Sequence, residues 1–64
     1  MTVPEIDIFR AANLWAAQHG EAAIPEARKK AAEFHTAGDR DGADVWLRII
    51  VAVETLRAPA TALH

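Results

Sequence analysis

The chain contains 64 residues, and 52% of them are hydrophobic, but 15 of these are alanine, so few side chains can fill a core. A chain of this length forms one compact unit that buries only about 60% of the surface exposed when it is unfolded. The absence of cysteine excludes a disulfide framework and thiolate chemistry, and the net charge of −2 argues against nonspecific binding to nucleic acid.

Residues 4–19 carry apolar side chains at helical rather than alternating spacing and are predicted to form the first helix. Pro4 suits the first helical position because its missing N–H would have no helical partner there. Gly20 follows the segment, and it can end the helix in a left-handed conformation without a Cβ penalty.

The first helix is expected to have a broad apolar face. When the residues are projected at about 100° per position, Ile6 and Phe9 lie within a face that covers about half of the circumference. Asn13 lies on the same face, where it either specifies register or oligomeric state or sits at the edge with a water or loop partner. Leu14 lies on the opposite side, which favours contact with a further helix or another chain.

Residues 22–37 are predicted to form the second helix, which Gly38 closes. Pro25 is tolerated because the N–H groups of the first turn have no intrahelical partner. The inward stripe repeats at intervals of three and four residues and consists of Ile24, Ala27, Ala31 and Phe34. Half of this stripe is alanine, so a neighbouring helix can approach closely, but the stripe contributes little apolar area.

The third helix is predicted over residues 41–57, with Asp39 or Asp41 as its N-cap. Leu47 and Val51 extend its apolar character to a second side, so this helix is either central in the fold or shared with a second subunit. Its main stripe consists of Val45, Ile49, Val53 and Leu56, with Trp46 and Ile50 beside it.

These segments predict an all-α protein, namely an antiparallel three-helix bundle with short connections near residues 20–21 and 38–40. The bundle is a single domain, and residues 58–64 are expected to be frayed because they show no periodicity. The expected core consists of Ile6, Phe9, Ile24, Phe34, Val45, Ile49, Val53 and Leu56.

The aspartates that follow Gly38 resemble a calcium-binding loop, but their spacing does not fit one. Counting Asp39 as position 1 places Asp44 where the loop requires glycine. We therefore expect the aspartates to cap the third helix and to place negative charge at its N-terminus.

The histidines also favour a structural role. No two of them are separated by three or four residues, and His19 and His35 fall at helix C-termini, where an imidazole interacts favourably with the helix dipole. The third, His64, is the last residue of the chain. Because the chain also lacks serine, cysteine and tyrosine, we expect no catalytic residue, no cofactor and no metal site.

Two stretches of the sequence stand out: residues 7–20, which read DIFRAANLWAAQHG, and residues 37–50, which read AGDRDGADVWLRII. With them the chain resembles short bacterial proteins of about this length, mostly from alphaproteobacteria, that are grouped as a domain of unknown function. The resemblance covers residues 6–57. It implies a complete small intracellular protein, and it brings no activity, ligand or site residue.

The two broad apolar faces exceed what the alanine stripe can cover, so the sequence favours a non-enzymatic protein-interaction module, possibly a homodimer. The expected partner-binding residues are Leu14, Trp15, Trp46, Leu47 and Val51. An alternative is a small regulator associated with nucleic acid through Arg28, Lys29, Lys30 and Arg40, although Asp41 and Asp44 would repel phosphate. No stretch is long and apolar enough to span a bilayer, and a cytoplasmic location without a small-molecule substrate is expected.

Overall fold

The structure is a computed structural model that describes residues 3–57. This part of the chain is helical and contains no strand, which confirms the all-α prediction. The frayed tail expected at residues 58–64, and with it His64, lies outside the described residues. The elements are α1 (Glu5–His19), the short 3-10 helix η1 (Gly20–Ala22), α2 (Ala23–Thr36) and α3 (Arg40–Arg57).

A glycine ends α1, as expected. Gly20 has φ +56° and ψ −126°, a backbone conformation that side chains with a Cβ rarely adopt. Its N–H still donates to the Ala16 carbonyl oxygen, so the last turn of α1 keeps its hydrogen bond while the chain changes direction into η1.

The connection between α2 and α3 is short and fully hydrogen-bonded. Gly38 has φ +81°, and its N–H donates to the His35 oxygen at 3.0 Å, while the N–H of Asp39 donates to the Phe34 oxygen at 2.9 Å. These two bonds form a Schellman motif, which satisfies carbonyl groups at the end of α2. The Asp39 carboxylate then accepts the Gly42 N–H at 2.9 Å, which confirms Asp39 as the N-cap of α3.

Gly42 allows the first turn of α3 to lie close to α2. A Cβ at this position would lie 2.6 Å from Cδ1 of Phe34 and 2.8 Å from Oδ2 of Asp39. Both distances are shorter than van der Waals contact, so a larger residue would displace the ring or the capping carboxylate.

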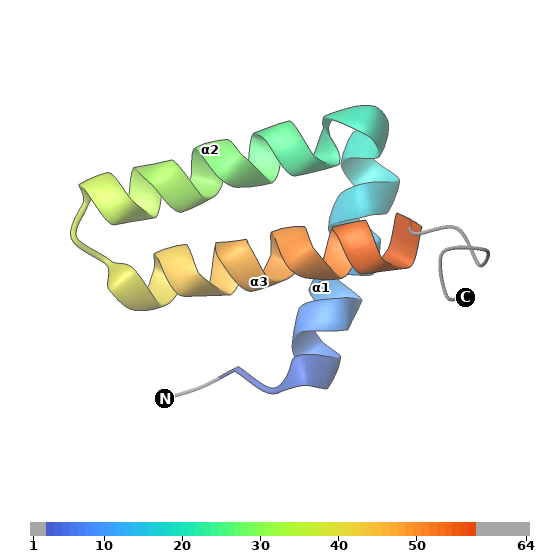
Figure 1. Cartoon of the computed structure of the whole chain (residues 1–64), viewed down its shortest axis with the longest axis horizontal. Helices are drawn as coiled ribbons and strands as arrows, with labels where there is room; N and C mark the ends of the chain where they lie inside the picture. Colours follow the sequence, from blue (N-terminus) through green and yellow to red (C-terminus); the bar gives the residue numbers. More distant parts are fainter. Residues whose placement is uncertain (1–2, 58–64) are drawn as a thin grey trace.

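Figure 1 shows α2 and α3 side by side and antiparallel, joined by the tight connection, whereas α1 crosses them on one side instead of running alongside. α3 packs against both other helices, and α1 contacts α2 much less than it contacts α3. The antiparallel packing of three helices expected from the sequence is therefore found for α2 and α3, whereas α1 crosses them instead of lying alongside.

The core lies where α1 crosses α3 and along the seam between α2 and α3. Ile8 and Val53 are the largest fully buried side chains among the described residues. The remaining buried residues are Ala12, Ala23, Ala27, Ala31, Ala43, Ile49, Ile50 and Ala52. Six of the ten buried residues are thus alanine, and short side chains let the helix backbones approach closely.

The predicted core is partly confirmed and partly wrong. Ile49 and Val53 are buried, whereas Ile6 is 62% exposed and Leu56 is 45% exposed. The crosswise position of α1 explains the first error, because α1 turns Ile8 and Ala12 toward α3 and leaves Ile6 on the opposite side of the helix. Leu56 lies in the last turn of α3, near the end of the described chain. The other four predicted core residues, Phe9, Ile24, Phe34 and Val45, are half-buried.

Candidate protein interface

The two tryptophans pack against each other. Trp15 of α1 meets Trp46 of α3 edge to face, with ring centroids 4.7 Å apart and an interplanar angle of 69°. The Trp15 indole N–H donates to the Ala23 carbonyl oxygen at 2.7 Å, and the His19 ring lies over Trp15 with a centroid distance of 3.8 Å. Both indoles are half-buried and join α1 to α3 and to the start of α2.

Two arginines of α3 bind backbone carbonyl groups near the two ends of α1. Arg48 donates to the Val3 oxygen at 2.8 Å and to the Glu5 carboxylate at 2.7 Å. Arg57 donates to the Gly20 oxygen. Bonds from a charged donor are stronger than bonds between neutral groups, so these contacts fix the direction in which α1 crosses α3.

We expect Arg48→Gln to lower the free energy of unfolding by about 1 kcal/mol, because glutamine loses the ion pair and is too short to reach both acceptors. The ion pair itself contributes little, since the Glu5 side chain is 72% exposed. Urea denaturation measures the loss, and amide hydrogen exchange should show faster opening of the first turn of α1. Arg10→Gln is the matched control, because Arg10 is exposed on α1; an equal loss in both variants would contradict this role of Arg48.

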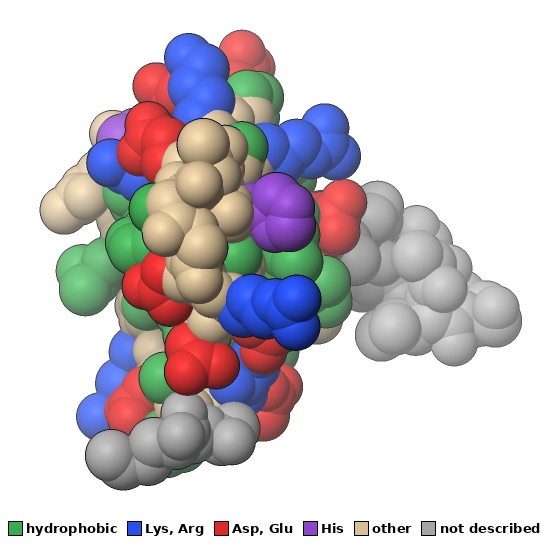
Figure 2. Space-filling model, turned by 90° about the vertical axis from the view of Figure 1, so that its left-hand side faces the viewer, with side chains coloured by type: hydrophobic (Ala, Val, Ile, Leu, Met, Phe, Trp, Pro, Cys, Tyr) green, Lys and Arg blue, Asp and Glu red, His purple; other side chains and the backbone are tan. Residues whose placement is uncertain are grey.

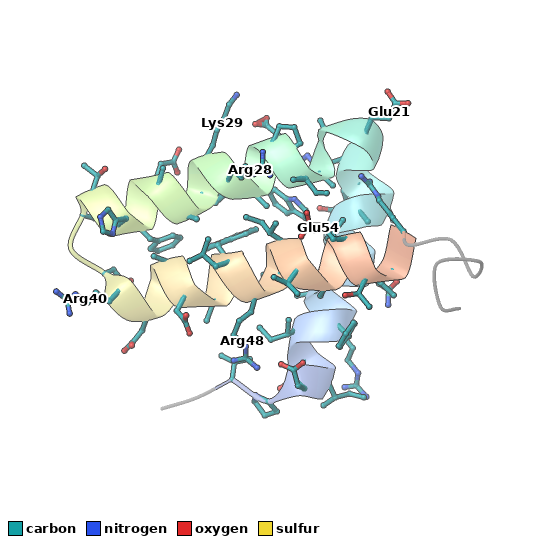
Figure 3. The ribbon with its side chains drawn as sticks, viewed as in Figure 1. Glu21, Arg28, Lys29, Arg40, Arg48 and Glu54 are labelled. Carbon is teal, nitrogen blue, oxygen red and sulfur yellow. The ribbon has the colours of Figure 1, made fainter. Side chains whose placement is uncertain are left out.

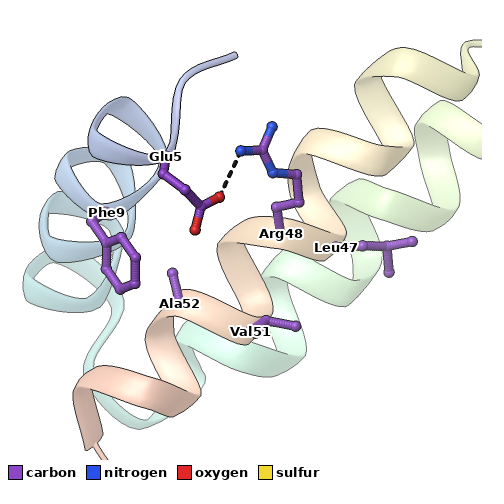
Figure 4. Close-up of a pocket in the computed structure, with 6 residues that line it drawn as sticks. All are labelled: Glu5, Phe9, Leu47, Arg48, Val51 and Ala52. Atoms are coloured by element: carbon purple, nitrogen blue, oxygen red, sulfur yellow. Dashed lines mark hydrogen bonds and ion pairs between the residues drawn. The ribbon is translucent and has the colours of Figure 1, made fainter. Parts of the chain in front are cut away.

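A shallow groove lies between the first half of α1 and the middle of α3 (Figure 4). Its volume is about 230 Å³, and the Glu5–Arg48 ion pair lies at one end of it. The residues that line it are Glu5, Phe9, Leu47, Arg48, Val51 and Ala52. Apart from the ion pair, these residues offer only apolar surface, so the groove suits an apolar side chain of a partner.

Leu47 lies between this groove and a second hollow. The second hollow has a volume of about 320 Å³ and lies between α2 and α3, lined by Ala31, Ala32, His35, Ala43 and Leu47. Leu47 is 53% exposed and Val51 is 60% exposed. Figure 2, which faces the end of the molecule with the α2–α3 connection, shows hydrophobic side chains at the surface among charged ones. We call Leu47 and Val51, with the two hollows beside them, the α3 ridge.

The five partner-binding residues expected from the sequence do not lie on one surface. Leu47 and Val51 lie together on the α3 ridge, whereas Trp15 and Trp46 pack against each other between α1 and α3. Leu14 is 65% exposed and lies on the face of α1 that points away from the buried Ile8 and Ala12. It is therefore not part of the ridge. Asn13 is exposed, which agrees with its interpretation as an edge residue.

The four cations of the nucleic-acid hypothesis are not gathered on one surface. Lys29 pairs with Glu26 at 3.1 Å, and Lys30 lies 3.8 Å from Glu33. Figure 3 shows Lys29 and Arg28 on α2, whereas Arg40 lies at the start of α3. The pairing lowers the local positive charge that phosphate groups would meet.

Sequence reasoning missed Phe9 and the two hollows as parts of the surface, because the hollows form only when helices pack together: one where α1 crosses α3, the other between α2 and α3. Within residues 3–57, no group of three or more histidine, aspartate or glutamate side chains is placed to hold a metal ion. No helix among the described residues has the length and apolar character required to cross a bilayer. All buried residues in this part of the chain are apolar.

No protein-family profile matches the chain, and comparison with curated proteins and with solved structures likewise returned no match. The resemblance to the alphaproteobacterial domain of unknown function therefore stays a prediction.

Proposed function

We propose that this chain is a non-enzymatic helical module of the cytoplasm that binds another protein surface through the α3 ridge. The observation that carries the proposal is the exposure of Leu47 and Val51, at 53% and 60%, next to two hollows. Both side chains remain exposed although the chain has few large apolar residues in its core. Large apolar side chains that protrude beside a cavity are typical of interaction sites, because burying both against a partner removes apolar surface from water.

The arrangement of α1 further supports this proposal. Because α1 crosses α3 instead of lying along it, it leaves one long side of α3 without a neighbouring helix. A three-helix fold with α1 alongside would have covered more of that side. The ridge is therefore a consequence of the crossing, which Arg48 and Arg57 hold in place.

Replacing Leu47 and Val51 together with lysine is expected to abolish association while the chain stays folded. Both side chains are exposed, and lysine is a good helix former, so the circular dichroism spectrum and the denaturation midpoint should change little. Association is measured by sedimentation over a range of concentrations and by affinity capture from the cells that naturally make the chain.

Leu14→Lys is the matched control, because Leu14 is a similarly exposed leucine away from the α3 ridge. The proposal predicts that the wild type and Leu14→Lys associate alike and that only the double variant loses the partner. If the wild type sediments as a monomer and captures nothing beyond what the double variant captures, the proposal is wrong.

A role in binding nucleic acid is the alternative, using Arg28, Lys29, Lys30 and Arg40. No specific observation favours it over the interaction module, because two of the four cations are paired with carboxylates on the same helix. A salt-sensitive mobility shift with duplex or single-stranded nucleic acid would support this alternative.

A further inference from the structure

We propose that the partner of the α3 ridge is a second copy of the same chain, with two α3 helices packed antiparallel about a two-fold axis that passes beside Leu47. This inference rests on the proposed function and adds the identity and the register of the partner. It follows from three properties of the ridge: its shape, the spacing of its residues and its charges.

The shape of the ridge is self-complementary. Leu47 protrudes with hollows of about 230 Å³ and about 320 Å³ on its two sides. A two-fold interface brings the same patch of each copy together, so a protruding residue must meet a depression of the same surface. Antiparallel packing about Leu47 places Val51 of each copy level with Ala43 of the other, a buried residue that forms part of the floor of the second hollow.

The spacing places further residues on the same side of α3. Arg40, Leu47 and Glu54 follow one another at intervals of seven residues, so they lie within an arc of about 40° on the helix surface. Ala43 and Val51 widen this arc to about 80°. All of these residues belong to the continuous helix α3 (Arg40–Arg57), so the helical spacing places them on one side of the same helix.

The charges at the two ends of this stripe are opposite. Arg40 and Glu54 are exposed, and neither makes an ion pair within residues 3–57. They lie 14 positions apart on a straight helix, which is about 21 Å, so they cannot pair with each other in one copy. With Leu47 at the two-fold axis, Arg40 of each copy stands level with Glu54 of the other, and two reciprocal ion pairs form.

The charges also exclude the nearest competing register. If Leu47 of one copy stood level with Val51 of the other, Asp44 would stand level with Glu54 of the partner. Like charges opposite each other are unfavourable, so the charge pattern selects the arrangement centred on Leu47. The apolar contact is confined to the side of one helix, so we expect a dimer in the micromolar range or weaker.

Charge reversal tests the register without disturbing the fold. Arg40→Glu places a negative charge at the N-terminus of α3, and Glu54→Arg places a positive charge in its last turns; both changes agree with the helix dipole. In each single variant the two reciprocal pairs become repulsive, so we expect the dimer dissociation constant to rise about tenfold or more at low salt. The double variant Arg40→Glu/Glu54→Arg restores opposite charges and should dimerise like the wild type.

Mixing the two single variants gives the sharpest result. One variant presents glutamate at both positions and the other presents arginine at both, so the mixture should form heterodimers although each variant alone is mainly monomeric. Native mass spectrometry distinguishes the heterodimer by mass, and sedimentation equilibrium from about 1 µM to about 1 mM gives the dissociation constants. Lys30→Glu/Glu33→Lys is a matched control, since it exchanges the charges of an exposed pair on α2, outside the Arg40–Glu54 pairing, and should not produce heterodimers with either single variant.

A wild type that stays monomeric throughout this range overturns the inference, as does a dimer that the single reversals leave unchanged. If the chain is monomeric and a different protein is captured through Leu47 and Val51, the proposed function stands and only the second copy is excluded. If a dimer forms but the mixture gives no heterodimer, the register centred on Leu47 is wrong.

Discussion

Replacing Ile8 with alanine is expected to remove about 2–5 kcal/mol from the free energy of unfolding. Ile8 is 2% exposed and lies in the cluster where α1 crosses α3, against Ile49, Ala52 and Val53. Several of these neighbours are already small, so they cannot move in to fill the space that the isoleucine leaves. The free energy of unfolding of a domain is about 0.05–0.15 kcal/mol per residue, so the expected loss is a large part of the free energy of unfolding of such a short chain.

Ile6→Ala is the matched control for this prediction. Both isoleucines belong to α1, but Ile6 is 62% exposed, so its truncation should change the free energy of unfolding by no more than about 0.5 kcal/mol. Chemical denaturation followed by tryptophan fluorescence measures both variants. A similar loss at both positions, or a larger one at Ile6, would show that α1 buries the face predicted from the sequence rather than the face seen in the structure.

Enlarging Ala12 to leucine is expected to destabilise the chain by about 1–3 kcal/mol. Ala12 is fully buried at the crossing of α1 and α3, where its small side chain sets how close the two helices approach. A leucine would push α1 away from α3 and would strain the bonds that Arg48 makes to Val3 and Glu5. Thermal unfolding by circular dichroism gives the shift in midpoint.

Ala17→Leu provides the comparison on the same helix. Ala17 is exposed, and leucine is nearly as good a helix former as alanine, so this substitution should be close to neutral. If Ala12→Leu were equally neutral, the crossing would contain space that the structure does not show, and α1 would be free to shift along α3.

The helices and their ends could be predicted from the sequence because their causes are local. Gly20 and Gly38 end helices through their positive φ, and Asp39 caps α3 through a bond three residues along the chain. The alanine stripe of α2 was also predicted, and Ala27 and Ala31 are buried. Such features depend on a few neighbouring residues, so pattern and capping rules suffice.

The crossing angle of α1 could not be predicted in the same way. The apolar face of α1 is about half the circumference wide, so the pattern allows either Ile6 or Ile8 to point to the core. The choice depends on contacts distant in sequence, such as the bond from Arg48 to Val3 and the packing of Trp15 on Trp46. The exposure of Leu47 and Val51 follows from this choice, and the hollows beside them cannot be inferred from α3 alone.

The double role of Asp39 bears on the order in which the chain folds. The Asp39 N–H donates to Phe34 at the end of α2, and its carboxylate accepts the Gly42 N–H at the start of α3, so the turn that joins the two helices needs no other part of the molecule. Contacts between segments adjacent in sequence cost little loop-closure entropy. The α2–α3 hairpin therefore has the kinetic advantage of a nucleus, and we expect α1 to add to it last, through contacts of Arg48 with Val3 and Glu5 that span 45 and 43 residues.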